Sequence, residues 1–240
     1  QIQGKGEVKV TDDFSYRSET IKTVTVASGI TGIGDRTFSN CKNLKRISLP
    51  GTLRSIGVRA FGDTSITSIK LPNGLKSIGA YAFYQSKITS LDIPKTVTKI
   101  EEYAFSYCSS LESVSIPGSV KTLPESLFEA DMKLKKVTLG QGVSRIERAA
   151  FRHCGLTGIS FPDSVTLIDE SAFSLCSDLR KVTLPKKLTE IGNGAFGNCR
   201  KLGNITIPAS VKKIRSNAFY DCQAMKKITI LNSKTVIEKE

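Results

Sequence analysis

The chain has 240 residues, of which 39% are hydrophobic and 24% are charged, and this composition is typical of a globular protein rather than a disordered one. No apolar run approaches the ~18 residues that a membrane-spanning helix needs, so we expect no membrane insertion. The formal net charge of +13 suits an acidic partner such as nucleic acid, an anionic glycan or a membrane surface, but it also suits a merely well-solvated surface.

A repeat of 22 or 23 residues begins near Ile21 and continues to about Leu231. Its register is kept by nine phenylalanines, which are Phe38, Phe61, Phe83, Phe105, Phe128, Phe151, Phe173, Phe196 and Phe219. Ala precedes most of them, and all six cysteines stand three residues after one of them. This period predicts a solenoid of stacked coils, because one unit cannot bury its own apolar face.

Each repeat combines two periodicities. Between residues 191 and 202 apolar residues recur at steps of three and four, which predicts a short helix or helical turn. From 202 to 207 the step becomes two, which predicts a strand with one buried side, and Pro208 ends that strand because it lacks an N–H. A second short extended piece at 211–214 leads into the next turn. Strands stacked in parallel would make a curved rod on the order of 45 Å long.

The unit L-x-x-I-x-[IL]-P, with A-F-x-x-C after it, resembles the BspA-like, or Treponema-type, leucine-rich repeat. The resemblance implies an α/β solenoid, a right-handed coil of about nine 22–23-residue repeats. It further implies a parallel β-sheet on the concave face and short helical turns or short strands elsewhere. It also implies a bacterial protein that is secreted or exposed on the cell surface, with adhesion to a host or matrix protein as the usual role.

Three segments are expected from this resemblance. Residues 1–20 resemble the N-terminal cap of the family, with a hairpin-like entry, and residues 21–231 form the solenoid. Residues 232–240 form a C-terminal end that lacks the A-F turn needed to close the last coil, which leaves a truncated repeat as one interpretation. We expect an extracellular or cell-surface monomer whose signal peptide has been removed.

The cysteine column argues against disulfides. Cys154, Cys176, Cys199 and Cys222 occupy equivalent places in successive coils, so their side chains should point inward in the same direction. A disulfide instead needs Cβ atoms that face each other about 3.8 Å apart. We therefore expect free, buried thiols. Zinc is not expected, because the chain has no C-x-x-C and a single histidine.

No group of residues in the sequence indicates catalysis or a cofactor. The stretch GNGAFG at 192–197 matches a dinucleotide-binding fingerprint, but it falls on the A-F turn of the repeat and no βαβ unit surrounds it. His153 is a lone imidazole without a nucleophile and an orienting acid. The acidic pairs at 101–102 and 169–170 fall where helices are expected to start, and the helix dipole favours acids there. We expect a protein without enzymatic activity.

The outward-facing positions of the predicted strands are small, polar and rich in hydroxyl groups, and lysines occupy alternate strands of the C-terminal half. An anionic partner could contact this face and its edge at Arg46, Lys70, Lys135, Lys136, Arg180, Lys181, Lys226 and Lys227. The alternative is that these cations only keep exposed strands soluble. The face has no aromatic residue, which argues against nucleic acid as a partner.

A second candidate contact patch lies beside the A-F turn and consists of Tyr81, Tyr84, Tyr103 and Tyr107. The alternative for these tyrosines is aromatic packing along the helical edge. We expect a binding or adhesion scaffold that recognises a host or matrix protein or an anionic glycan. The remaining hypothesis is a structural spacer that presents another domain lying outside this sequence.

Overall fold

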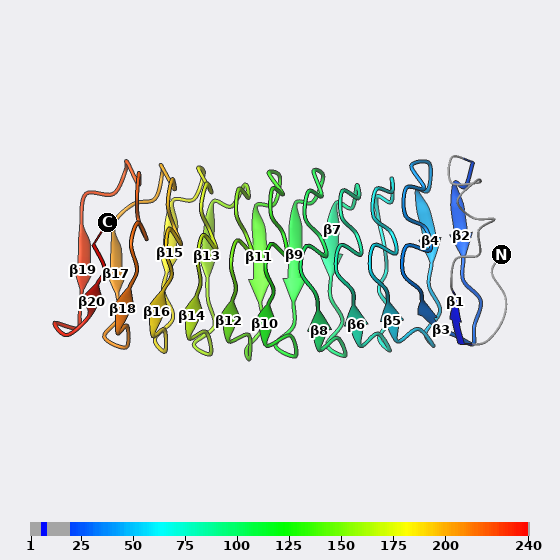
Figure 1. Ribbon diagram of the computed structural model, residues 1–240, viewed down its shortest axis with the longest axis horizontal. Helices are drawn as coiled ribbons and strands as arrows, with labels where there is room; N and C mark the ends of the chain where they lie inside the picture. Colours follow the sequence, from blue (N-terminus) through cyan, green and yellow to red (C-terminus); the bar gives the residue numbers. More distant parts are fainter. Residues whose placement is uncertain (1–5, 9–19, 240) are drawn as a thin grey trace.

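The repeats wind into one parallel β-solenoid, which the computed structural model shows from end to end in Figure 1. The structure describes residues 6–8 and 20–239. Within these residues every paired strand runs parallel to its neighbour. The rear strands from β3 to β20 mark ten successive coils, so the predicted solenoid is confirmed with about one coil more than its nine Phe-bearing repeats.

Each coil contributes to two faces, as the two predicted extended pieces of the repeat require. The front face consists of the strands that precede the proline column, which are β2 (Thr23–Thr25), β4 (Arg46–Ser48), β7 (Ser90–Asp92), β9 (Ser113–Ile116), β11 (Lys136–Leu139), β13 (Gly158–Ser160), β15 (Lys181–Thr183), β17 (Ile205–Ile207) and β19 (Ile228–Ile230). The front ladder is divided into β2-β4, β7-β9-β11, β13-β15 and β17-β19.

The rear face consists of the short strands that follow the proline column. Their order is β1-β3-β5-β6-β8 and then β10-β12-β14-β16-β18-β20. These strands are β1 (Gly6–Val8), β3 (Ile30–Ile33), β5 (Ser55–Ile56), β6 (Ser77–Ile78), β8 (Lys99–Ile100), β10 (Thr122–Leu123), β12 (Arg145–Ile146), β14 (Leu167–Ile168), β16 (Glu190–Ile191), β18 (Lys213–Ile214) and β20 (Val236–Ile237).

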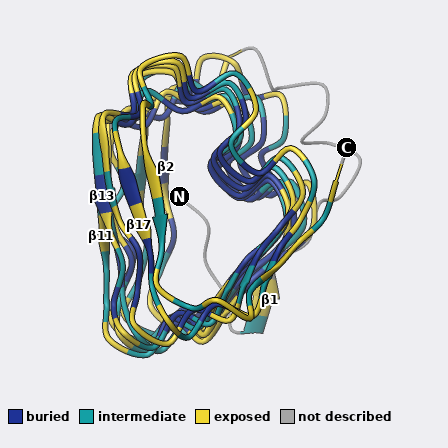
Figure 2. Ribbon diagram, turned by 90° about the vertical axis from the view of Figure 1, so that its left-hand side faces the viewer, coloured by how far each residue is buried: buried dark blue, intermediate teal, exposed yellow. Residues whose placement is uncertain are grey.

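The phenylalanine column forms the centre of the core. Neighbouring rings lie 5.2–5.7 Å apart between centroids, and their planes are within 20° of parallel. Eight of the nine rings, from Phe38 to Phe196, are fully buried. Figure 2 looks along the rod and shows these buried segments (dark blue) folded into its interior, opposite the front strands β11, β13 and β17. The stack therefore runs through the solenoid as one continuous apolar column.

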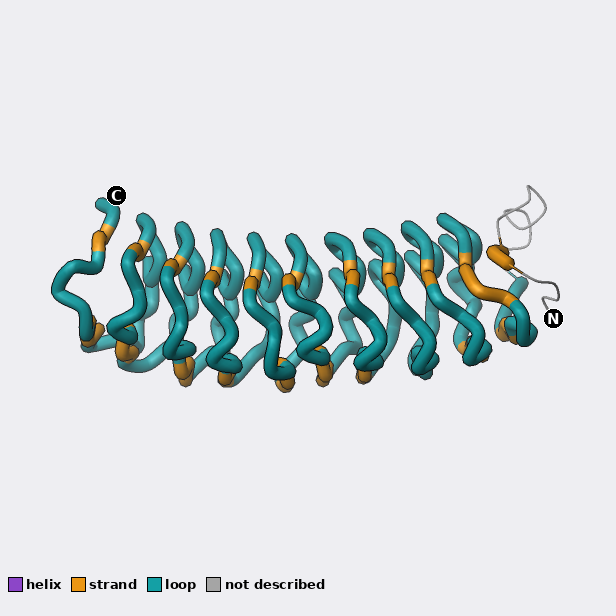
Figure 3. Tube along the Cα trace, turned by 90° about the horizontal axis from the view of Figure 1, so that it is seen from below, coloured by secondary structure: helices purple, strands orange, loops and turns teal. Residues whose placement is uncertain are grey.

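The prediction of a helical turn at the A-F motif is wrong, and so is the predicted α/β fold class. The described residues contain no helix, as Figure 3 shows. The reason is that two residues in each turn have positive φ, for example Ser126 (52°) and Ala130 (62°) on either side of Phe128. A right-handed helix requires φ near −60° throughout, so each of these residues prevents it.

The backbone of the turn bonds to the next coil instead of to itself. The N–H of Ser126 donates to the carbonyl of Arg148 (2.9 Å), and the N–H of Phe128 donates to the carbonyl of Ala150 (2.9 Å). A helix would have used these donors internally, at i→i−4. The turns thus add a third set of inter-coil hydrogen bonds, and the apolar spacing of three and four reflects a tight turn rather than a helix.

The structure describes little of the expected N-terminal segment and nearly all of the expected C-terminal end. Most of residues 1–20, predicted as a hairpin-like cap, lie outside the described residues, and the described part, β1, pairs in parallel with β3. At the other end β20 pairs in parallel with β18 up to Ile237. The boundaries expected at 20 and 231 stay predictions. The rod is nearly straight in Figure 1 and bows only gently in Figure 3, so neither face lines a deep concavity. In the described part, no helix is long and apolar enough to cross a bilayer.

Truncating one ring of the column tests its role in stability. We expect Phe128→Ala to lower the free energy of unfolding by about 3–5 kcal/mol, because it removes a buried ring and leaves a cavity between two others. Urea unfolding followed by circular dichroism measures the change, with the exposed Thr138→Ala as the control. A loss below about 1 kcal/mol for Phe128→Ala would show that the column is not the core that holds the coils together.

Candidate functional site

The front face presents its side chains in the columns that the period-two pattern predicts. Along β15 the residues Lys181 and Thr183 are exposed, while Val182 between them is partly buried against the core. Strand pairing places Lys181 beside Gly158 and Thr183 beside Ser160. Each column therefore continues from coil to coil, and one surface position follows the next at roughly the 4.8 Å strand spacing.

A hollow of about 370 Å³ opens on this face between β11 and β15. Its lining combines three ammonium groups, two hydroxyl groups and no carboxylate, and it consists of Lys135, Lys136, Val137, Gly158, Ile159, Ser160, Lys181 and Thr183. A smaller hollow of about 210 Å³ adjoins it on the N-terminal side and includes Asp92. The positive character of the face is thus concentrated C-terminal to Asp92.

The structure brings together three of the eight predicted cationic contacts, Lys135, Lys136 and Lys181, around this hollow. Arg46 and Lys70 are exposed, but they lie in N-terminal coils beyond Asp92. The predicted cations nearer the C-terminus, Arg180, Lys226 and Lys227, are also exposed and do not line the hollow.

Two cations at the edge of the front face, Lys135 and Arg180, lie near the carboxylate of Asp178, whereas Lys136 and Lys181 on the face form no ion pair within the described part of the chain. Asp178 pairs with Lys201 at 2.6 Å, and its pKa is lowered first by Lys201 and also by Arg180 and Lys135. None of the ion pairs among the described residues involves Lys136 or Lys181. Lys136 shares the smaller hollow with Asp92 but forms no ion pair with it, so both face lysines remain available to an anion.

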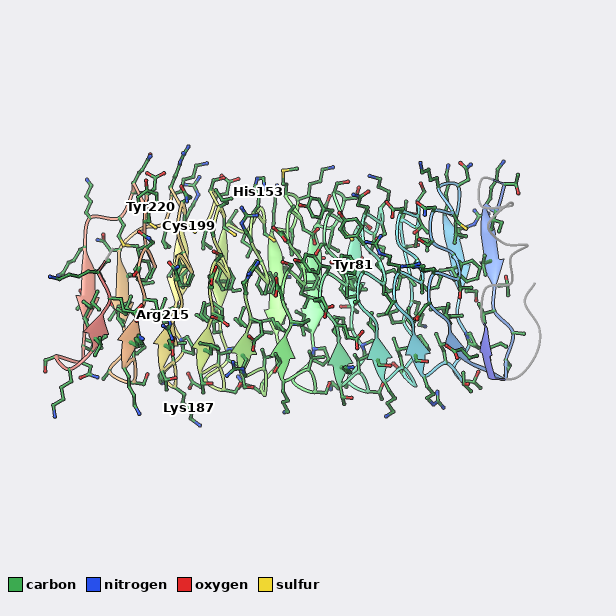
Figure 4. The ribbon with its side chains drawn as sticks, viewed as in Figure 1. Tyr81, His153, Lys187, Cys199, Arg215 and Tyr220 are labelled. Carbon is green, nitrogen blue, oxygen red and sulfur yellow. The ribbon has the colours of Figure 1, made fainter. Side chains whose placement is uncertain are left out.

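The tyrosine patch is held together by its own rings. Tyr81 and Tyr103 stack with centroids 4.7 Å apart, and the guanidinium of Arg59 lies 4.6 Å from the Tyr81 centroid (Figure 4 labels Tyr81). Tyr84 and Tyr107 are also in ring contact, at 5.4 Å. Both faces of the Tyr81 ring are thus occupied, which favours aromatic packing; a partner contact at these tyrosines stays a prediction.

The acidic pairs do not serve as helix starts, because the described coils contain no helix. Glu101 instead accepts a hydrogen bond from the backbone N–H of Ala80 (3.1 Å) in the preceding coil and pairs with Lys99 at 2.6 Å. Asp169 accepts from the N–H of Glu170 (2.7 Å). These carboxylates hold turns together, which the sequence pattern alone did not indicate.

The rear face carries a larger hollow, about 600 Å³, whose arginines, Arg145 and Arg215, each form an ion pair with a glutamate. Arg215, on one side of it, pairs with Glu190 at 2.5 Å and reaches Glu238 at 3.5 Å. His153 is exposed at the edge of the rod (Figure 4), as expected of a lone surface imidazole. The described residues contain no cluster of three or more His, Cys, Asp or Glu side chains that could hold a metal ion.

All six cysteines are free and buried, which confirms the sequence prediction. The sequence did not reveal that five of these thiols bond to a phenylalanine carbonyl of the preceding coil. For example, Cys176 Sγ lies 3.1 Å from the carbonyl oxygen of Phe151, and Cys199 Sγ lies 3.1 Å from that of Phe173. Burial raises the pKa of Cys176 to about 12, so the thiol stays protonated and unreactive near neutral pH.

Asp131 occupies the cysteine column of its coil and is completely buried. One carboxyl oxygen, Oδ1, accepts a hydrogen bond from the N–H of Cys108 (2.7 Å), while Oδ2 has no partner. Burial raises the pKa of Asp131 well above its usual value, against the opposing effect of the Cys108 hydrogen bond. The carboxyl is thus a structural weak point of the core and faces no solvent where a ligand could reach it.

Comparison with known proteins agrees with this architecture. Residues 31–157 and 144–240 match the model of the BspA type leucine rich repeat region, in six copies. A leucine rich cell surface protein from Faecalibacterium prausnitzii is 27% identical, with a TM-score of 0.53 over 90% of this chain and 61% of its own. This chain thus spans less than two thirds of that protein. No curated protein matches the chain.

Two further solved structures support the fold alone. A leucine-rich repeat protein from Bacteroides ovatus is 24% identical, with a TM-score of 0.55 over 97% of this chain and 78% of its own. The pneumococcal vaccine antigen PcpA is 22% identical, with a TM-score of 0.53 over 89% of this chain and 69% of its own. Both share the stacked-coil architecture.

The buried carboxyl of Asp131 should make stability depend on pH. Because its folded pKa is raised, the folded state keeps the proton while the unfolded state releases it above about pH 4. Stability should then fall as pH rises, by up to about 1.4 kcal/mol per pH unit between the two pKa values. Asp131→Cys, which restores the residue used by neighbouring coils, should remove this slope. Urea unfolding of the parent protein and of Asp131→Cys at pH 4, 5.5 and 7 measures how the free energy of unfolding depends on pH. Identical slopes for the two proteins would contradict a raised pKa of Asp131 as the cause.

Proposed function

The chain belongs to the BspA-type leucine-rich-repeat family, and on that basis we propose that it is a non-catalytic scaffold of the bacterial cell surface whose front face binds an anionic glycan. The observation that carries the proposal is the pair Lys136 and Lys181, which line one open hollow and take part in none of the ion pairs among the described residues. The positive charge of such a surface attracts a polyanion, and added salt weakens this attraction.

A scaffold role is supported by where the repeated residues lie. The recurring Phe, Ala and Cys side chains are buried and hold the coils together, so the repeat contributes a rod and its surface columns rather than a reactive centre. Solenoids commonly use such extended surfaces for binding. The similar protein from F. prausnitzii is described as a cell surface protein, which supports the same location here.

The chemistry of the face favours a glycan over a protein partner. Protein hot spots are enriched in Trp, Tyr and Arg, whereas the exposed front columns from β11 to β17 carry lysines, hydroxyl groups, a glycine and an asparagine. Ammonium and hydroxyl donors suit sulfate, carboxylate and sugar oxygens. An acidic protein surface or a pure spacer role would each give a different result in the following test.

Reversing the two face charges tests the proposal. We expect Lys136→Glu/Lys181→Glu to weaken binding to immobilised heparin, used here as a sulfated-glycan probe, by about tenfold or more. The matched control is Arg46→Glu/Lys70→Glu, which changes net charge equally on the N-terminal part of the same face and should stay within about twofold. Biolayer interferometry at two salt concentrations, with neutral dextran as the blank, measures both.

Three outcomes would contradict the proposal. Equal losses in the two double variants would mean that net charge alone attracts the polymer. Absence of binding at both salt concentrations would favour the spacer role. Preference for an acidic peptide over heparin would identify a protein partner instead.

A further inference from the structure

We propose that the hollow over Gly158 is a discrete subsite, in which one sulfate or carboxylate group of a linear glycan lies between Lys136 and Lys181. The inference rests on the proposed function and adds where the anion binds and how the glycan runs. Three features of the structure lead to it: a missing side chain, a break in the strand ladder and the distribution of charge on either side.

Gly158 leaves space where the surface column would otherwise place a side chain. In the same column the positions from Ser90 to Lys227 all carry side chains except this one: Ser90, Ser113, Lys136, Gly158, Lys181, Asn204 and Lys227. Because Gly158 separates two lysines, the missing side chain allows an anion to approach both ammonium groups from the same side.

The fold itself does not require glycine at this position. A Cβ added to Gly158 would meet only the Lys181 carbonyl oxygen, at an ordinary contact distance of 3.4 Å, and its φ is not positive. Gly118 is a contrasting case, since its Cβ would collide with the backbone of Gln141. The glycine at 158 therefore opens a surface hollow and relieves no strain.

The strand ladder is interrupted at the same place. β13 pairs with β15 but not with β11, so the hollow lies over a seam between two pieces of the front sheet. The coil from Phe151 to Phe173 has 22 residues, whereas the coil before it has 23, and the residue is lost between Cys154 and Leu156. Val137 and Ile159 line the hollow at this seam, and the hydroxyl-bearing residues Ser160 and Thr183 line it as well.

Charge on either side gives the glycan a direction. On the N-terminal side Asp92 lines the adjoining hollow and repels an anion. On the C-terminal side the next lysine of the column is Lys227, two strands beyond Lys181. Alternate strands are roughly 10 Å apart, so the geometry fits a linear polymer lying along the rod, with acidic groups repeating at about that distance.

Filling the hollow without changing charge tests the subsite. Gly158→Thr places the hydroxyl residue typical of this face into the space, and we expect it to weaken binding of a size-defined heparin oligosaccharide about fivefold or more. The matched control is Gly203→Thr, whose added Cβ also meets only a carbonyl oxygen, that of Arg180 at 3.5 Å, outside the hollow. The control should bind within about twofold of the parent protein.

Isothermal titration calorimetry gives the affinities, and thermal unfolding checks that both variants fold. A desulfated heparin oligosaccharide that retains its carboxylates shows which of the two anions the subsite binds. If Gly158→Thr weakens binding of the sulfated or of the desulfated oligosaccharide, the subsite is supported. If charge reversal at 136 and 181 weakens binding but Gly158→Thr does not, the subsite is overturned while the proposed function stands. If neither the charge reversal nor Gly158→Thr weakens binding, the proposed function and the subsite are both overturned. If Gly158→Thr and Gly203→Thr weaken binding equally, the subsite is overturned.

Discussion

The register between neighbouring coils is the constraint on which the structure depends. Every layer of the cross-section bonds to its equivalent one coil away: rings stack at 5.2–5.7 Å, thiols lie against phenylalanine carbonyls, and backbone donors of strands and turns reach the next coil. In the described coils, short-range bonds within a coil satisfy only part of the backbone, and the rings are covered by the rings of neighbouring coils. A residue that departs from its column, such as Asp131, therefore weakens the contacts of two coils together.

The same register arranges the surface. Because buried columns repeat at each coil, outward columns must repeat as well, and a lysine on every second strand becomes a line of charge along the rod. Interruptions of that regularity then define local sites. At Gly158 a missing side chain, a shortened coil and a seam in the front ladder coincide between Lys136 and Lys181, and the surface changes from a uniform array to a hollow.

The turns show why spacing was an incomplete guide. Apolar residues three and four apart can lie on one side of a helix or of a tight turn, and the pattern does not distinguish them. The residues with positive φ at these turns include Tyr107, Leu175 and Ala149, none of which marks a left-handed conformation in a sequence. Only bonding to the next coil holds them there, so the helix expectation failed where tertiary contacts overrode local preference.

The sequence by itself determined the period, the buried columns, the two extended pieces, the free thiols and the lysines of the front face. Each of these depends on which side chains recur at the same position of the repeat, because equivalent positions stack on one another in a solenoid. The tertiary structure alone decided the turn conformation, the divisions of the front ladder, the stacking within the tyrosine patch and the unpaired charge of Lys136 and Lys181. These depend on distances between coils, which residues far apart in the chain set together.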